Sequence, residues 1–211
     1  MKRISVSARC AAAIVFECTL VALVIGVAAD DASQAARLYE LLALQPGMAV
    51  ADIGAGSGEM TILIAQRLDK SGRVYSTDIN QDRLKEIRAA ASKAHLENVV
   101  VVEGAEKATN LPAECCDAIF IRNVYHHFVD PTAMNRSLLA ALKPGGRLAI
   151  IDFVPRRGSE LPAGAPADRG GHGVTAEIVS NELTAAGFTK TQTIDQWDGS
   201  RGEFLVLFRR P

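Results

Sequence analysis

Short apolar runs alternate along most of the chain with segments in which apolar residues recur every three or four positions. The runs predict strands at 50–53, 73–79, 99–102, 116–121 and 147–154. Strands that are apolar at nearly every position are typical of sheets buried on both faces. The alternation therefore predicts an α/β fold, with a mostly parallel, Rossmann-like sheet of seven strands and helices on both faces.

The periodic segments predict helices that include 60–68, 84–91, 131–143 and 175–186. Asp130 is placed to cap the third of these helices, and Pro144-Gly145-Gly146 is expected to end it. Two final strands, at about 188–196 and 203–208, flank Asp198-Gly199, which is a hairpin turn signal. The C-terminal part of the chain therefore adds an antiparallel hairpin to the sheet.

The first 29 residues differ in character from the domain expected at 30–211. Three basic residues precede an apolar run over 11–29, and small residues before Asp30 complete the layout of a cleavable secretory signal. Glu17 interrupts the run, and the uninterrupted part is too short to span a bilayer as a helix. We expect export, or membrane association through 11–29; the alternative is an N-terminal helix packed on a cytoplasmic domain.

Composition narrows the classes of function. With 48% apolar and 22% charged residues, the chain of 211 residues is expected to form one soluble globular domain rather than a disordered or coiled-coil protein. A formal charge of -1 gives no electrostatic reason to expect a nucleic-acid partner. No His/Cys spacing resembles a zinc site, so the sequence predicts no metal.

The strongest candidate site follows the first predicted strand. The segment Asp52-Ile53-Gly54-Ala55-Gly56-Ser57-Gly58 places a glycine at every second position after an acid. Glycines allow a tight strand-to-helix turn and a close approach of a ligand to the backbone. Asp78, at the end of the second strand, can accept hydrogen bonds from both hydroxyls of a ribose. Together they predict a nucleoside site, although the glycine spacing differs from that of dinucleotide loops.

These residues, together with Leu142-Lys143-Pro144-Gly145-Gly146, resemble the class I S-adenosylmethionine-dependent methyltransferase family. The resemblance covers about 38–208. It implies the strand order 3-2-1-4-5-7-6 with strand seven antiparallel, S-adenosyl-L-methionine as cofactor, and methyl transfer. The cofactor contacts that it implies are Asp52, Gly54, Gly56, Gly58, Asp78, Ile79, Ala105, Glu106 and Asn123.

Tyr125, His126 and His127 follow the fourth predicted strand, where this family places the reacting methyl group. The paired histidines resemble those of the small-molecule members of the family, of the quinone-biosynthesis and arsenite type. Imidazole titrates near neutrality, so either histidine is a candidate general base, with Tyr125 the next candidate. An orienting or packing role for the histidines is the alternative. An arsenite acceptor would require thiolates near the methyl donor, whereas Cys115 and Cys116 enter the fourth strand from its opposite end.

The stretch 155–173 follows the fifth strand and is rich in glycine and proline. It is expected to be either a lid that contributes Arg169 or His172 to the site, or a solvated loop. Without a large inserted acceptor domain, a small-molecule substrate is favoured over a protein or RNA. An NAD-binding oxidoreductase and a cofactor-binding module without turnover remain the alternative functions.

Overall fold

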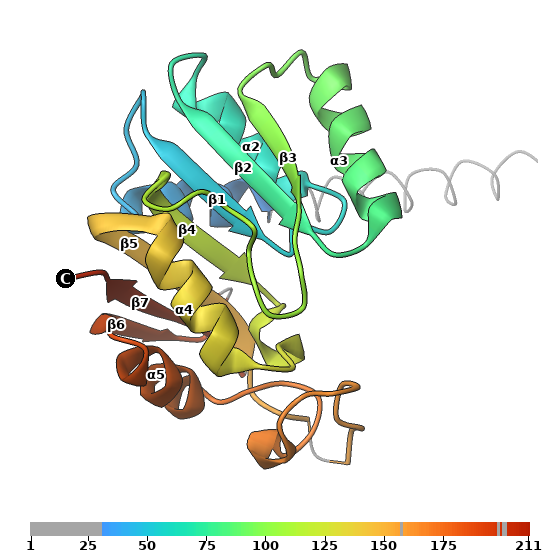
Figure 1. Cartoon of the computed structure of the whole chain (residues 1–211), viewed down its shortest axis with the longest axis vertical. Coiled ribbons are helices and arrows are strands. Elements are labelled where there is room, and N and C mark those ends of the chain that lie inside the picture. Colours follow the sequence, from blue (N-terminus) through green and yellow to red (C-terminus); the bar gives the residue numbers. More distant parts are fainter. Residues whose placement is uncertain (1–30, 157, 198, 200–201) are drawn as a thin grey trace, which may run out of the picture.

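The computed structural model describes residues 31–156, 158–197, 199 and 202–211 (Figure 1). They include a seven-stranded sheet in the order β3-β2-β1-β4-β5-β7-β6. The strands are β1 Ala49–Ile53, β2 Arg73–Asp78, β3 Val99–Glu103, β4 Cys116–Arg122, β5 Leu142–Phe153, β6 Thr189–Asp195 and β7 Glu203–Arg209. β7 pairs antiparallel with β5 and β6, whereas the pairs among β1–β5 are parallel. The predicted fold class and strand order are confirmed.

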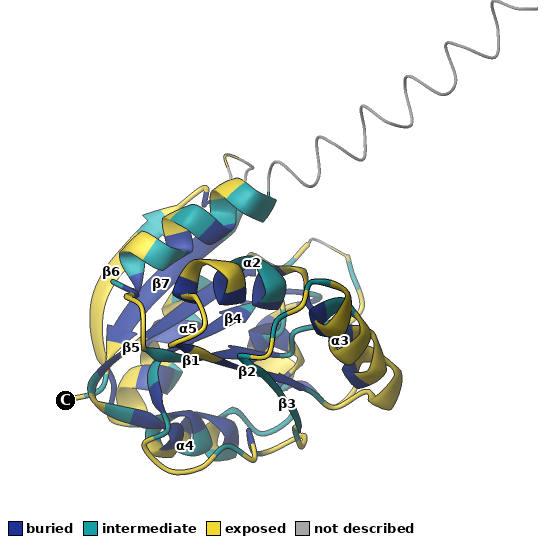
Figure 2. Cartoon of the chain, turned by 90° about the horizontal axis from the view of Figure 1, so that it is seen from above, coloured by how far each residue is buried: buried dark blue, intermediate teal, exposed yellow. Residues whose placement is uncertain are grey.

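Helices cover both faces of the sheet (Figure 2). They are the helical residues 31–41, α2 Glu59–Leu68, α3 Gln81–Lys93, α4 Pro131–Ala141 and α5 Ala176–Ala185, with short 3-10 helices η1 Tyr125–His127 and η2 Ala167–Arg169. Helix 31–41 and α2 share one apolar core with the sheet, and α4 and α5 share the other. In β4, Ile119 and Ile121 belong to the α4/α5 core and Phe120 to the opposite one. This division explains the uninterrupted apolar runs of the sequence.

Side-chain caps fix where the helices begin, and with them where the preceding loops end. Asp130 accepts a hydrogen bond from the backbone N–H of Ala133 at the start of α4, and Thr175 caps α5 through the N–H of Ile178. Pro131 occupies the first turn of α4, where its missing N–H costs nothing. The start expected for α4 is confirmed.

The beginning of β5 differs from the prediction. α4 ends at Ala141 and β5 begins at Leu142, so the Lys143-Pro144-Gly145-Gly146 turn lies inside the strand rather than before it. The N–H of Gly145 donates to the carbonyl of Arg210, and the N–H of Arg210 donates to the carbonyl of Gly146. These bonds to the end of the chain keep the turn in the sheet as a bulge, which Gly145 accommodates with a φ of 75°.

Residues 1–29, including the expected signal or anchor segment at 11–29, lie outside the described part of the chain. Among the residues that are described, no helix is both long and apolar enough to cross a membrane.

Trp197 connects helix 31–41 to the β6–β7 end of the sheet. Its ring is fully buried, the Arg37 guanidinium lies 4.3 Å from the ring centroid, and its Nε1–H donates to Gln34. Trp197→Ala should lower the free energy of unfolding by about 3–5 kcal/mol, because it removes a large core side chain together with its cation–π contact. Trp197→Phe keeps a ring under Arg37 and should cost clearly less. Urea unfolding followed by circular dichroism measures the free energy of unfolding of both variants. Equal losses of stability in the two variants would contradict a stabilising contact between the ring and Arg37.

Candidate functional site

An open cavity of about 830 Å³ lies beyond the carboxyl ends of the parallel strands. Its lining includes, from the loops after β1 to β4, Gly54, Gly56, Asp78, Ile79, Ala105, Glu106, Asn123 and His127. A smaller cavity of about 270 Å³ adjoins it and shares Gly54, Gly56 and Asn123 while adding Asp52 and Arg122. The structure thus brings nearly all of the residues expected at a cofactor site to one edge of the sheet, which is where open α/β sheets bind ligands.

The three glycines of the loop after β1 have different surroundings. A Cβ on Gly54 would lie 2.7 Å from the side chain of Val124, so this side chain packs directly on the Gly54 backbone. A Cβ on Gly56 would meet nothing within 4 Å, which leaves its backbone accessible from the cavity. Gly58 lies outside the lining of both cavities and approaches Ile87 of α3. Gly58 therefore serves helix packing, while Gly56 leaves space for a ligand.

Asp78 joins the first two loops. One carboxylate oxygen accepts a hydrogen bond of 3.0 Å from the N–H of Gly56, and the other accepts one of 2.9 Å from the N–H of Asn80. Ile79, the next residue, exposes 62% of its surface although it is a large apolar side chain. A charged acceptor beside an uncovered apolar side chain suits a ligand with vicinal hydroxyls next to a flat base.

Asp52 is the most deeply buried acid of the cofactor set. Its side chain is 3% exposed and accepts a hydrogen bond of 2.6 Å from Thr61 of α2, whose hydroxyl also lies 2.8 Å from that of Ser76. Burial raises the pKa of Asp52 to about 7, against the smaller opposing effects of Thr61 and the Arg122 guanidinium. A cationic ligand group bound in the smaller cavity would therefore favour the ionised form of the Asp52 carboxyl.

Arg122 closes the side of the smaller cavity. Its guanidinium lies 2.6 Å from the carboxylate of Asp31, at the start of helix 31–41. Both side chains are at most a quarter exposed, so the pair is better shielded than a surface ion pair. Neither Asp31 nor Thr61 was expected at the site, because no motif or spacing in the sequence distinguishes them from other polar helix residues.

The two histidines of η1 differ in burial. His126 is 1% exposed; its Nδ1 lies 2.8 Å from a carboxylate oxygen of Asp152, and its backbone N–H donates to the other oxygen. His127 is exposed and lines the larger cavity. Partial desolvation and the neighbouring His126 and His172 lower the pKa of His127. Of the two candidate bases, His127 is therefore the one that lines the cavity.

Tyr125 and Arg169 line neither cavity. The Tyr125 hydroxyl donates to Glu182 of α5 and accepts from Asn135 of α4, both at 2.8 Å, and burial raises its pKa. The Arg169 guanidinium, fully buried, pairs with the same Glu182 at 3.0 Å. The third candidate base and the lid arginine thus belong to a buried polar network between α4, α5 and the loop 155–173.

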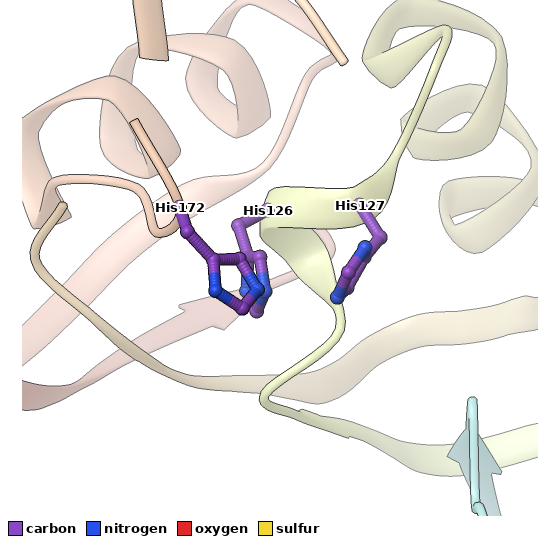
Figure 3. A group of neighbouring side chains, drawn as sticks. All are labelled: His126, His127 and His172. Carbon is purple, nitrogen blue, oxygen red and sulfur yellow. The ribbon is translucent and has the colours of Figure 1, made fainter. Parts of the chain in front are cut away.

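His172, the other candidate of that loop, faces the histidines of η1 (Figure 3). Its ring centroid lies 4.8 Å from that of His126 and 5.5 Å from that of His127. The loop also contributes Ala163 to the larger cavity. Asp152, which holds His126, was missed by sequence reasoning; a lone acid within the apolar segment Ile150-Ile151-Asp152-Phe153 is the signal that marks it.

The adjacent cysteines lie at the opposite edge of the sheet. Cys116 is the first residue of β4, and Cys115 lines a separate hollow of about 860 Å³ at the amino ends of the strands. The cavity beyond the carboxyl ends has no cysteine in its lining. Thiolate ligands for an arsenite acceptor are therefore absent from the described lining, as the sequence indicates.

Solved structures share this architecture. A SAM-dependent methyltransferase from Aquifex aeolicus superposes with a TM-score of 0.69 at 25% identity over 84% of this chain and 89% of its own. Phosphoethanolamine N-methyltransferase 2 from Haemonchus contortus, in complex with S-adenosyl-L-methionine, has the same fold, with a TM-score of 0.68 at 15% identity over 85% of this chain and 52% of its own. The strand order and the glycine loop beside Asp78 define a class I S-adenosylmethionine-dependent methyltransferase.

The chain belongs to this methyltransferase family, since the family model described as a methyltransferase domain matches residues 44–197. The ubiquinone/menaquinone biosynthesis C-methyltransferase UbiE of Shewanella frigidimarina is 33% identical over 115 residues. That match covers 54% of this chain and 46% of the relative, so the chain matches less than half of the length of that protein. The resemblance recognised in the sequence is confirmed at the level of the family.

Asp52 makes the stability of the domain depend on pH. Its pKa in the folded state, about 7, lies above its ordinary value of 3.8, so its contribution to stability is complete below about pH 4 and is lost as the pH rises through 7. Asp52→Asn keeps an acceptor for Thr61 without this titration. The free energy of unfolding of the variant, relative to the wild type, should therefore rise by up to about 4 kcal/mol between about pH 4 and pH 8.

Urea unfolding of the unliganded proteins at a series of pH values measures this difference. Asp82→Asn, which changes an exposed acid in the first turn of α3, is the matched control and should show a nearly constant difference from the wild type. A constant difference for Asp52→Asn as well would show that the Asp52 carboxyl titrates normally in the folded state.

Proposed function

We propose that this domain binds S-adenosyl-L-methionine in the cavity at the carboxyl edge of the sheet and catalyses methyl transfer to a small molecule. The observation that carries the proposal is the joining of the first two strand loops by Asp78, directly beside the open space at Gly56. When bound, the cofactor supplies a methyl group already activated on a sulfonium sulfur. The task left to the protein is to bind and orient two reactants.

The residues of the cavity fit the parts of this cofactor. Asp78 offers a carboxylate to the ribose hydroxyls, and the exposed side chain of Ile79 offers an apolar surface to the adenine. The smaller cavity, with Asp52 on its wall, suits the charged methionine end. Ala105 and Glu106 complete the wall on the β3 side. An NAD-binding function has no comparable support, because the family matched by the chain is a methyltransferase family.

The acceptor would occupy the part of the larger cavity formed by the second half of the domain. There the lining consists of His127 together with the mainly apolar residues Phe128, Val129, Met134 and Ala163. An apolar wall with one imidazole suits a small, largely apolar molecule that carries a polar group. The name of the Shewanella relative, a quinone-biosynthesis C-methyltransferase, supports an aromatic acceptor such as a quinol or a phenol.

Replacement of Asp78 tests the cofactor site. Asp78→Ala removes the acceptor for a ribose and for the N–H of Gly56, so the dissociation constant of S-adenosyl-L-methionine should rise roughly 5- to 150-fold, the equivalent of about 1–3 kcal/mol. Asp78→Asn retains one oxygen acceptor, so its dissociation constant should lie between those of Asp78→Ala and the wild type. Titration calorimetry measures all three proteins.

Asp82→Ala is the control for the loss of one negative charge near the start of α3. Asp82 is exposed and pairs with Lys85, so its removal should leave the dissociation constant within about twofold. If the wild-type domain shows no binding, or if Asp78→Ala binds as tightly as the wild type, the cofactor site is wrongly assigned.

Replacement of His127 tests the acceptor side. His127→Ala should reduce the transfer of labelled methyl groups from S-adenosyl-L-methionine to a panel of quinols and phenols by about 10²-fold, because the acceptor loses a positioning contact. Cofactor affinity should change little, since the cofactor contacts come mainly from the loops after β1 and β2. His95→Ala changes a histidine near the amino ends of the strands and should retain full transfer.

The same assay separates an enzyme from a module without turnover. A wild-type domain that binds the cofactor tightly but transfers no label to any acceptor of the panel, or to a small-molecule cell extract, would contradict the proposed activity.

A further inference from the structure

Three of the four histidines of the chain lie together beside the proposed acceptor site. His126 and His127 come from η1, and His172 comes from the loop 155–173, far along the chain (Figure 3). One ring nitrogen from each of the three lies within 4.8 Å of the other two. Two distant segments thus bring their imidazoles to one point, which a solvated loop would not require.

His126 has one nitrogen engaged and one available. Its Nδ1 is held by the carboxylate of Asp152, while its Nε2 is buried and has no hydrogen-bond partner among the described residues. A buried polar atom without a partner costs about 1–3 kcal/mol. With Nδ1 carrying the proton toward Asp152, Nε2 presents a lone pair, which is the arrangement of a carboxylate–histidine pair that binds a metal.

We propose that His126, His127 and His172 bind a divalent transition-metal ion, with Zn²⁺ as the ion that suits the donor set. Three neutral imidazoles are borderline donors that zinc accepts, and sites with three protein ligands leave a fourth position open. Ligand bonds of about 2.0–2.1 Å place tetrahedral nitrogens about 3.4 Å apart. The nitrogens must therefore approach one another by about an ångström, which requires only small rotations of the exposed His127 and the partly buried His172.

Phe153 supports this arrangement of the rings. Its own ring lies 4.8 Å from that of His126 and 5.6 Å from that of His172, centroid to centroid, and Asp152 precedes it in β5. The end of β5 therefore supplies both the carboxylate that orients one ligand and an apolar wall against two of them. Ligands held by such neighbours lose little freedom when an ion binds.

The open position of the ion would face the larger cavity, because His127 lines it. The role of this position rests on the proposed function: it would receive an oxygen or sulfur atom of the methyl acceptor. A metal ion lowers the pKa of a coordinated hydroxyl or thiol, so the proton is released to solvent and the anion remains as the nucleophile. The site would thereby select acceptors that carry such a group.

Zinc binding can be measured without turnover. The whole chain, stripped with a chelator, is titrated with Zn²⁺ by calorimetry and should take up one ion per chain. His127→Ala and His172→Ala each remove one ligand and should weaken binding by more than tenfold, and Asp152→Asn, which removes the anchor of His126, by about 10- to 100-fold. Substitution by Co²⁺ should give the visible absorption of a tetrahedral site, which the histidine variants should lose.

His95→Ala is the matched control, because it removes the remaining histidine of the chain and leaves the cluster intact. Zn²⁺ should raise the midpoint of thermal unfolding of the wild type and of His95→Ala, and of neither cluster variant. This readout also shows that the variants are folded. Absence of one-site binding to the folded wild type, or unchanged binding in both His127→Ala and His172→Ala, would overturn the metal site.

Binding of S-adenosyl-L-methionine to the zinc-free protein is measured in parallel. Zinc uptake by the cluster without any cofactor binding would contradict the proposed function and leave the metal site standing. If the protein binds the cofactor and transfers methyl groups but takes up no zinc, the metal site is contradicted and the proposed function stands.

Discussion

The sheet of this domain is covered on both faces, and that constraint decides where polar chemistry can take place. Side chains in the middle of β4 and β5 enter one apolar core or the other, so a charged group there would lose its hydration without a partner. The ends of the strands are the places where a polar group is both held by a rigid element and open to a ligand. Since β1, β2, β3 and β4 are parallel, their carboxyl ends meet at one edge. The cavity follows from this geometry.

Two buried acids lie near the carboxyl ends of β1 and β5, and both are held by neighbouring elements. Asp52 of β1 receives the hydroxyl of Thr61 from α2, and Asp152 of β5 receives the backbone and ring of His126 from η1. Each is 3% exposed or less. Burial of a carboxylate is costly, and such groups gather where a charge is needed for binding or chemistry. Asp52 lines the smaller cavity, and Asp152 holds His126, the neighbour of the cavity residue His127.

Much of the fold could be predicted because its causes are local. Apolar runs mark strands, Asp130 marks the helix that it caps, and glycines at every second position mark the first loop. The start of β5 was placed too late, because Pro144-Gly145-Gly146 has the composition of a loop. Its backbone bonds to Arg210, near the chain terminus, keep it in the sheet, and no local pattern announces a partner so far away.

Contacts between distant parts of the chain also limit what the sequence predicts of the site. The glycine loop and Asp78 lie close together in the chain and form a motif, so they could be named from their spacing. The meeting of His172 with His126 depends on the path of the loop 155–173, which has no periodicity, and the role of Asp152 depends on a contact across 26 residues. Tyr125 shows the converse: it stands beside the histidines in sequence, yet its hydroxyl turns to Glu182 in the interior.

The two halves of the cavity come from different parts of the chain, so the proposed cofactor site and the proposed acceptor site consist of different residues. The loops after β1, β2 and β3 make the end that fits a nucleoside, while η1, α4 and the loop 155–173 make the other end. The two halves meet at the edge of the sheet where β1 and β4 pair. Substitutions in the second half can therefore alter which acceptor fits while the glycine loop and Asp78 keep their geometry. A fold arranged in this way can retain one methyl donor and change its substrate through a single loop and a few side chains of η1 and α4.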